Sequence, residues 1–195
     1  MRRVKVHLEN IPGSPYSQSA QHDTPMLDRE SHDDFDKRTW RKKCTVGRDG
    51  GVAIPAMALK QCLDTAAYKV GYKVPNRRGA TFKSFFASGV ICDADVPIAN
   101  GKPLKPDDAE CVTISANPTG DRGGGKRVPR RFPVFDKWHG IASFTILDDV
   151  ITREVFEHHI RTGGMVVGIG RFRPEKGGTN GRFRVVKCEW EDVKL

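Results

Sequence analysis

The chain has 195 residues, enough to bury a hydrophobic core, and its length favours one domain, or one domain with a large insertion, over two independent domains. Its 33 Lys and Arg residues against 24 Asp and Glu give a formal net charge of +9, which favours a polyanionic partner such as nucleic acid. Five widely spaced cysteines form no CxxC pair, and no apolar run is long enough to span a membrane. We therefore expect no disulfide framework, no metal site, no cofactor and a cytoplasmic location.

Strand and helix patterns alternate along the first half of the chain. Residues 4–8 alternate between apolar and polar side chains, which is the period of a half-buried strand. Residues 33–43 and 55–70 show the helical spacing of apolar side chains, and Gly71 provides a stop for the second helix. The polar segment 14–19 is either an ordinary loop or a loop that contacts a ligand through its tyrosine and glutamine.

The second half of the chain predicts several strands and one further helix. Thr152 is placed to cap a helix that ends before Gly163. We expect a single nucleic-acid-binding domain over residues 1–195, with loops inserted at 13–32, 97–110 and 117–130. The expected strands lie at 90–92, 112–114, 131–134, 140–147, 165–169 and 183–186.

The charges are distributed unevenly. Acidic side chains cluster at 23–36, whereas basic side chains cluster at 122–131 and 171–187. A third basic stretch, 73–83, has aromatic residues interleaved with its cations or close by. Cations can meet phosphates while rings stack on bases, so this pattern favours a strand of nucleic acid, although the phenylalanines that follow also suit a buried core.

Residues 168–183 form the most informative segment. Its glycines let the backbone approach a ligand closely, its arginines can fork onto phosphates, and its phenylalanines can pack or stack. The segment is not a dinucleotide-binding fingerprint, because Arg173 stands where the third glycine is required, and it lacks the GK[ST] ending of a phosphate-binding loop. A flexible hairpin tip is the alternative interpretation.

Signals of catalysis are sparse. His158 and His159 project about 100° apart on a helix and lack the HExxH spacing of a zinc protease. Asp148 and Asp149 fit a capping turn before a helix better than a site for a divalent ion. No pattern pairs a histidine with a second catalytic group, so we expect the chain not to be an enzyme.

Two segments resemble a known family. Ile54, Pro55, Leu59 and Lys60 match the "strand, IPxxxLK, helix" element of the repeat-associated mysterious protein (RAMP) superfamily, which includes the backbone subunits of CRISPR effector complexes. The segment 168–183 resembles that superfamily's C-terminal glycine-rich loop, which likewise follows a helix and a strand. The resemblance implies an α+β fold with an RRM-like, ferredoxin-like antiparallel sheet, helices on one face and long basic loop insertions.

The resemblance also implies a function. Such a protein would hold single-stranded RNA or DNA by its phosphate backbone without sequence preference, and residues 122–131 would act as a clamp-like loop. Copies would stack along the strand in a CRISPR-like or phage nucleoprotein complex, where the acidic segment 23–36 could meet a neighbour's basic loop. The candidate contact residues are Lys60, Arg77, Arg78, Lys83, Arg122, Lys126, Arg127, Arg130, Arg131, Gly168, Gly170, Arg171, Arg173, Lys176 and Arg182.

The sequence also departs from the family pattern. Ala56 and Ala58 stand where small polar residues or glycine are usual, and the chain is short for an effector backbone subunit. The segments 14–19 and 168–181 are also similar to proteins of phages and prophages. Three alternatives therefore stay open. The first is a phage single-stranded DNA-binding or annealing protein, and the second is a metal-independent endoribonuclease with a histidine as general base. The third is a protein-binding inhibitor of host defence.

Overall fold

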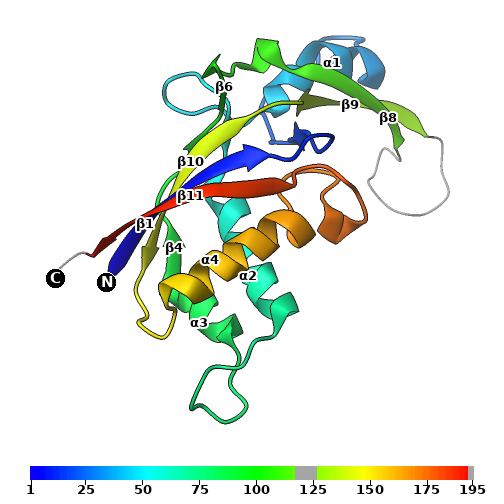
Figure 1. Ribbon diagram of the computed structural model, residues 1–195. Helices are drawn as coiled ribbons and strands as arrows, with labels where there is room; N and C mark the ends of the chain where they lie inside the picture. Colours follow the sequence, from blue (N-terminus) through cyan, green and yellow to red (C-terminus); the bar gives the residue numbers. More distant parts are fainter. Residues whose placement is uncertain (117–126, 193–195) are drawn as a thin grey trace.

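The computed structural model describes residues 1–116 and 127–192 and is organised around a central antiparallel sheet (Figure 1). Strand β1 (Arg2–Asn10) lies between β11 (Phe183–Asp192) and β10 (His139–Ile146) and is antiparallel to both. On its other side, β10 pairs with β4 (Val90–Cys92) and with β6 (Ala99–Asn100), which in turn pairs with β7 (Lys102–Pro103). The alternation predicted for residues 4–8 is confirmed, because Val4, Val6 and Leu8 are buried on one face of β1.

Three helices cover that buried face (Figure 1). They are α2 (Ala56–Val70), α3 (Phe82–Gly89) and α4 (Arg153–Thr162). Phe156 of α4 packs against Phe144 of β10 and Trp190 of β11, with ring centroids 5.3 and 5.6 Å apart. The predicted α+β architecture, with an RRM-like, ferredoxin-like antiparallel sheet and helices on one face, is confirmed.

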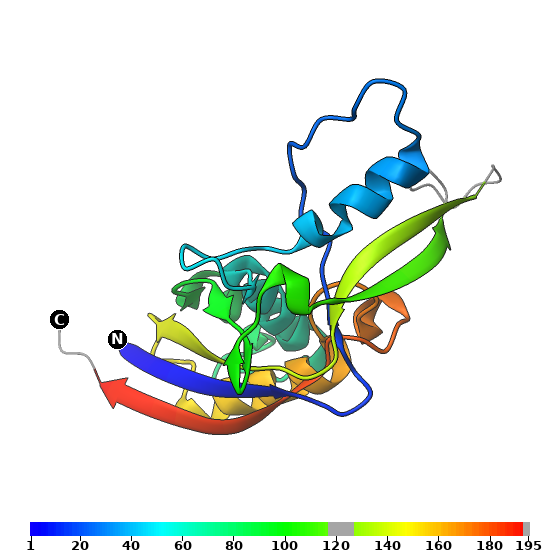
Figure 2. The same cartoon turned by 90° about the horizontal axis from the view of Figure 1, so that it is seen from above.

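A second antiparallel sheet lies beside the central sheet and its helices. Strand β9 (Val128–Phe135) pairs with β8 (Glu110–Ala116) on one side and with β2 (Tyr16–Ser17) on the other. Helix α1 (His32–Thr39) and the 3₁₀ turn Trp40–Lys43 run alongside the β8–β9 hairpin, which projects from the central sheet (Figure 2). The remaining elements are a β3 (Ala53–Ile54) and β5 (Val96–Pro97) pair and the 3₁₀ turns Pro106–Asp108 and Pro174–Lys176.

Local signals placed the helix boundaries well. The Thr152 hydroxyl accepts a hydrogen bond from the backbone N of Val155 and caps α4. Gly71 adopts the left-handed conformation that ends α2, with φ of 63°. The helix predicted for residues 33–43 is divided between α1 and the 3₁₀ turn that follows it.

The strand predicted at 165–169 is wrong. The chain instead extends α4 into a π-helical turn, Gly163–Val167, which closes with a hydrogen bond from the Gly168 N to the Gly163 carbonyl. A Cβ atom at Gly164 would overlap the carbonyl of Phe183, so the glycine lets the end of α4 press against the start of β11. This tertiary contact overrides the apolar strand pattern.

The predicted insertion segments contain little regular structure in the described ranges. Residues 13–32 contribute only β2 before the start of α1, and residues 97–110 contain the short β6 and β7 strands and one 3₁₀ turn. Most of the segment 117–130 lies outside the described residues. Within residues 1–116 and 127–192, no helix is long and apolar enough to cross a membrane.

Candidate nucleic-acid interface

The glycine-rich segment 168–183 folds back on its own chain. The Ile169 N donates a hydrogen bond to the Gly181 carbonyl at 2.9 Å, and the Asn180 N donates to the Phe172 carbonyl at 2.9 Å. A further bond joins the Arg171 N to the carbonyl of Ser17 at 2.9 Å, which ties the segment to β2. The segment is therefore a folded loop with internal bonds rather than a simple hairpin tip.

The glycines of this loop permit close packing of the backbone. Gly170 has φ of 73°, and a Cβ atom there would overlap the Ser17 carbonyl. Gly181 has φ of 70°, and a Cβ atom there would overlap the Ile169 carbonyl. A Cβ at Gly168 would lie 2.7 Å from the ring of Pro174. The backbone that these glycines approach is the protein's own, and their contact with nucleic acid stays a prediction.

The loop forms a groove with the first half of α2. One end of this groove is lined by α2 and the loop. The other end is lined by the loop, β2 and the start of α2. Both ends share Ala58, Gly170 and Arg173. We call it the α2–loop groove. Its lining thus includes parts of both segments that carry the family resemblance, although they are more than a hundred residues apart in the chain. The further lining residues are Tyr16, Gln18, Ser19, Ala20, Thr45, Pro55, Gln61, Cys62, Thr65, Val167, Gly168, Ile169, Arg171 and Glu175.

The segment 14–19 supports the groove rather than standing free. Tyr16 is 1% exposed, and burial raises the pKa of its hydroxyl. The Gln18 side chain donates to the Ala53 carbonyl at 2.9 Å and accepts a hydrogen bond from the Thr45 N. Both side chains are used by the fold, which favours the ordinary-loop interpretation of this segment.

Arg171 is the most unusual cation of the groove. Its guanidinium lies over the rings of Phe132, at 3.9 Å, and Phe172, at 5.1 Å. Burial lowers the pKa of this guanidinium, and its buried Nε atom has no hydrogen-bond partner. Among the described residues it forms no ion pair with a carboxylate. An arginine stays charged at neutral pH, so Arg171 presents a half-buried positive charge without a carboxylate partner in residues 1–116 and 127–192.

The other cations of the loop are engaged in part. Arg173 binds Glu175 through its Nε and a terminal nitrogen, at 2.9 and 2.8 Å, and donates to the Gly170 carbonyl at 3.2 Å. Lys176 lies 3.7 Å from the same glutamate. Arg182 donates from its backbone N to the Ser14 hydroxyl, while its buried Nε has no hydrogen-bond partner. Only part of the predicted positive charge of this loop is therefore available to a ligand.

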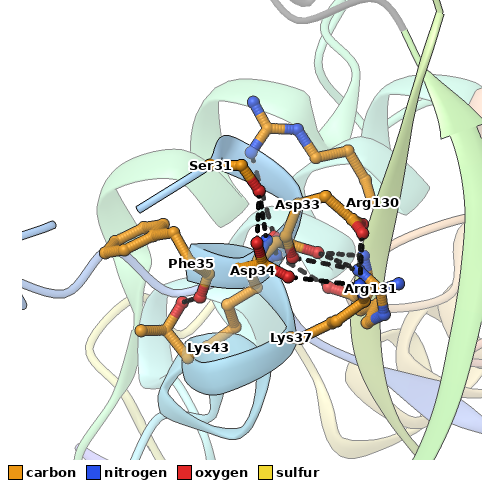
Figure 3. A network of polar contacts seen from close by, with 10 residues as sticks. Ser31, Asp33, Asp34, Phe35, Lys37, Lys43, Arg130 and Arg131 are labelled. Carbon is orange, nitrogen blue, oxygen red and sulfur yellow. Dashed lines mark hydrogen bonds and ion pairs between the residues drawn. The ribbon is translucent and has the colours of Figure 1, made fainter. Parts of the chain in front are cut away.

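The basic residues of β9 face the acidic helix of their own chain (Figure 3). Asp36 of α1 is 2% exposed and accepts hydrogen bonds from Lys43 at 2.5 Å and from the backbone N of Arg131 at 2.6 Å. The Arg131 guanidinium pairs with Asp33 at 2.8 Å, and that of Arg130 lies 3.8 Å from Asp36. Asp33 and Asp36, expected to meet a neighbouring copy, thus have partners in their own chain.

The remaining candidates are scattered. Lys60 is held by Asp64 and the Phe86 carbonyl, so it ties α2 to α3. Arg77 and Arg78 lie in the segment that follows α2, Lys83 lies in the first turn of α3, and none of the three lines the α2–loop groove. Arg127 is exposed just before β9. Arg122 and Lys126 lie outside the described residues.

The open face of the central sheet has no stacking platform. RRM domains bind bases on exposed aromatic side chains of this face. Here Arg3, Lys5 and His7 of β1 occupy it, and the ring of Trp190 in β11 packs on the helix side instead. Among the described residues of β1, β10 and β11, no phenylalanine, tyrosine or tryptophan side chain points to this face.

The histidines lie outside the groove. His159 is fully buried among aromatic rings, and His158 stacks on Tyr72. Neither end of the groove is lined by a histidine. Within the described ranges, no group of three His, Cys, Asp or Glu side chains is positioned to hold a metal ion.

Comparisons with known proteins give a likeness in fold. A chain in the cryo-EM structure of the type III-B Cmr-beta complex bound to cognate target RNA superposes with a TM-score of 0.53 and 12% identity, covering 97% of this chain and 60% of that one. The predicted likeness to CRISPR effector subunits is confirmed in the fold. This chain spans 60% of the length of that subunit.

Other comparisons are weaker. Cmr6 from Pyrococcus furiosus gives a TM-score of 0.49 at 13% identity, with 95% of this chain and 99% of that one covered. A chain of a CRISPR RNA-guided surveillance complex gives 0.40 at 10% identity, with 91% and 65% covered. No protein-family model and no curated protein matches the sequence.

Sequence reasoning missed two residues that shape this region. Phe132 provides the ring beneath Arg171, and Asp36 holds the basic residues of β9. Both roles depend on contacts between segments far apart in the chain, so no local pattern singles them out. The only available signal for Asp36 is its place among acidic residues on a helix.

Proposed function

We propose that the protein binds single-stranded nucleic acid through its phosphates along the α2–loop groove. The observation that carries this proposal is Arg171, a half-buried cation that lines the groove and has no carboxylate partner within the described residues. A phosphate oxygen would supply the acceptor that its guanidinium lacks, in the paired geometry that arginine favours. Contacts to phosphates carry no base information, so binding is independent of sequence.

The fold supports a place in a nucleoprotein assembly. A structural neighbour comes from a complex bound to target RNA, and this chain has a net charge of +9. Copies of the protein would lie along one strand, with partner subunits of the same kind of assembly beside them. Charge neutralisation of the strand then supplies most of the affinity.

Binding across a salt series tests the proposal. Nuclease-treated protein is titrated with labelled single-stranded RNA, single-stranded DNA and duplex, and the strands are afterwards run on a denaturing gel. We expect intact single strands to bind with an affinity that falls steeply with salt. Arg171→Ala should weaken binding and lower the slope of log affinity against log salt by about 0.7 for one lost phosphate contact. Flat salt dependence, or no binding, would refute the proposal.

A matched control distinguishes the groove from general positive charge. Arg184 is an exposed arginine of β11 that pairs with Glu9 at 2.8 Å, outside the groove. Arg184→Ala removes the same charge and should leave the salt slope almost unchanged. Equal effects of the two substitutions would mean that binding is diffuse.

The same experiment separates the alternative functions. A strong preference for DNA together with strand annealing would indicate a replication or recombination protein. Cut strands without added metal would indicate an endoribonuclease. A protein that leaves nucleic acid unbound but forms a stable complex with another protein would indicate an inhibitor.

A further inference from the structure

Five unneutralised cations gather beyond the groove at the C-terminal end of α2. Residues 65–92 contain no Asp or Glu. All five cations are exposed, and among the described residues none forms an ion pair with a carboxylate. We call this region, together with two tyrosines described next, the tyrosine end; its residues are Tyr68, Lys69, Tyr72, Lys73, Arg77, Arg78 and Lys83.

The two tyrosines expose their rings at this surface. Tyr68 is 64% exposed and Tyr72 is 51% exposed. The Lys83 Nζ lies 4.8 Å from the centre of the Tyr68 ring. Tyr72 stacks on His158 of α4, with ring centroids 4.9 Å apart and planes 17° from parallel. One face of Tyr72 is therefore held by the protein, and the ring is oriented without being covered.

The tyrosine end differs from the basic clusters of β9 and of the glycine-rich loop, where cations have carboxylate partners. Arg131 is paired with Asp33, and Arg173 is paired with Glu175. A surface that only confers solubility carries both signs of charge interspersed, and it has few exposed aromatic residues. Sites that bind single strands with little sequence preference instead combine unpaired cations with exposed aromatic rings.

The spacing along α2 joins the tyrosine end to the groove. Ala58, Gln61 and Thr65 line the groove. Tyr68 and Lys69 continue the same three- and four-residue steps, which place side chains on one face of a helix. Tyr72 follows directly after Gly71, the residue that ends the helix. The 15 residues of α2 span about 22 Å at 1.5 Å per residue, so the groove along its first half and the tyrosine end, which begins in its last turn and continues past it, are about one helix length apart.

We propose that the tyrosine end is a second contact for the same strand, where a base stacks on Tyr72 and neighbouring phosphates meet Lys73, Arg77 and Arg78. This inference rests on the proposed function and adds a surface to it. The strand leaves the α2–loop groove and follows the face of α2 to this end. The groove holds phosphates, whereas the tyrosine end adds base stacking, which favours single strands with unpaired bases over duplex.

Two sets of substitutions test the second contact on a long single-stranded homopolymer. Replacing Lys73, Arg77 and Arg78 together by alanine should lower the salt slope by about 2, from three lost phosphate contacts. Tyr72→Ala should weaken binding about tenfold through lost stacking, and Tyr72→Phe should retain the affinity. Photo-crosslinking with a halogenated uridine strand should mark the peptide that contains Tyr72.

The outcomes separate this inference from the proposed function. The three cations are exposed, so their removal leaves the fold intact even if Tyr72→Ala disturbs the packing against His158. If the triple variant keeps the wild-type slope while Arg171→Ala loses affinity, the second contact is refuted and the groove stands. If the triple variant loses affinity and Arg171→Ala does not, the tyrosine end is upheld and the groove is refuted. Absence of binding by the wild-type protein overturns both.

Discussion

Asp36 is the centre of the contact between α1 and the β8–β9 hairpin, and its removal tests how the hairpin is held. Asp36→Ala leaves Lys43 and Arg131, whose side chains are only 12% and 15% exposed, without their shared carboxylate. Removing one partner of a buried ion pair costs about 3–5 kcal/mol. We expect the free energy of unfolding to fall by about 3 kcal/mol, near the lower limit, because Asp33 still pairs with Arg131.

Urea unfolding measures this change, with tryptophan fluorescence and far-UV circular dichroism recorded together. Trp40 follows α1 directly and is 7% exposed, so its emission reports on this region. The control is Asp34→Ala on the same helix, where the side chain is 62% exposed and pairs with Lys37. Such exposed pairs contribute little to stability, so the control should change the urea midpoint far less. Equal midpoints for the two variants would refute the assignment of Asp36 as the buried centre.

Three further predictions follow from individual residues. Burial lowers the pKa of His159, so the folded protein binds a proton at this imidazole more weakly than the unfolded chain does. The free energy of unfolding should therefore be highest above about pH 6.5 and fall as the pH drops below that value. His159→Phe should reduce the difference between the urea midpoints at neutral and acidic pH. Gly170→Ala should destabilise the loop more than Gly177→Ala in thermal unfolding, because both glycines have positive φ but only the first would overlap a neighbouring carbonyl. Cys111 is exposed, whereas burial raises the pKa of the Cys44 thiol to about 12, so mass spectrometry after brief alkylation should find Cys111 modified first and Cys44 unmodified.

The elements with strong local signals were predictable from the sequence. Strand β1 has strict alternation, α2 has a broad apolar face that ends at Gly71, and α4 has the Thr152 cap. Each signal depends on neighbours within a few residues. The π-helical turn Gly163–Val167 has no such signal, because its conformation is set by the close approach of Gly164 to Phe183 at the start of β11.

The candidate site was predictable only in part. The IPxxxLK element and the glycine-rich loop were recognised as separate segments, and the fold brings them together in one groove. Charge counting, however, does not distinguish a cation that is free from one that has a partner. Lys60 was expected to contact nucleic acid, but its ammonium group is bound by Asp64 within α2.

The pairing of charges decides where the positive charge of this protein can act. The acidic side chains of α1 face the basic residues of β9, and Glu175 faces Arg173 and Lys176 in the loop. These carboxylates weaken the positive potential around the hairpin and part of the loop, because opposite charges within a few ångströms largely cancel at a distance. Arg171 and the tyrosine end keep their charge uncompensated among the described residues. The path that we propose for a polyanion therefore follows α2, from the groove at its start to the two tyrosines at its end.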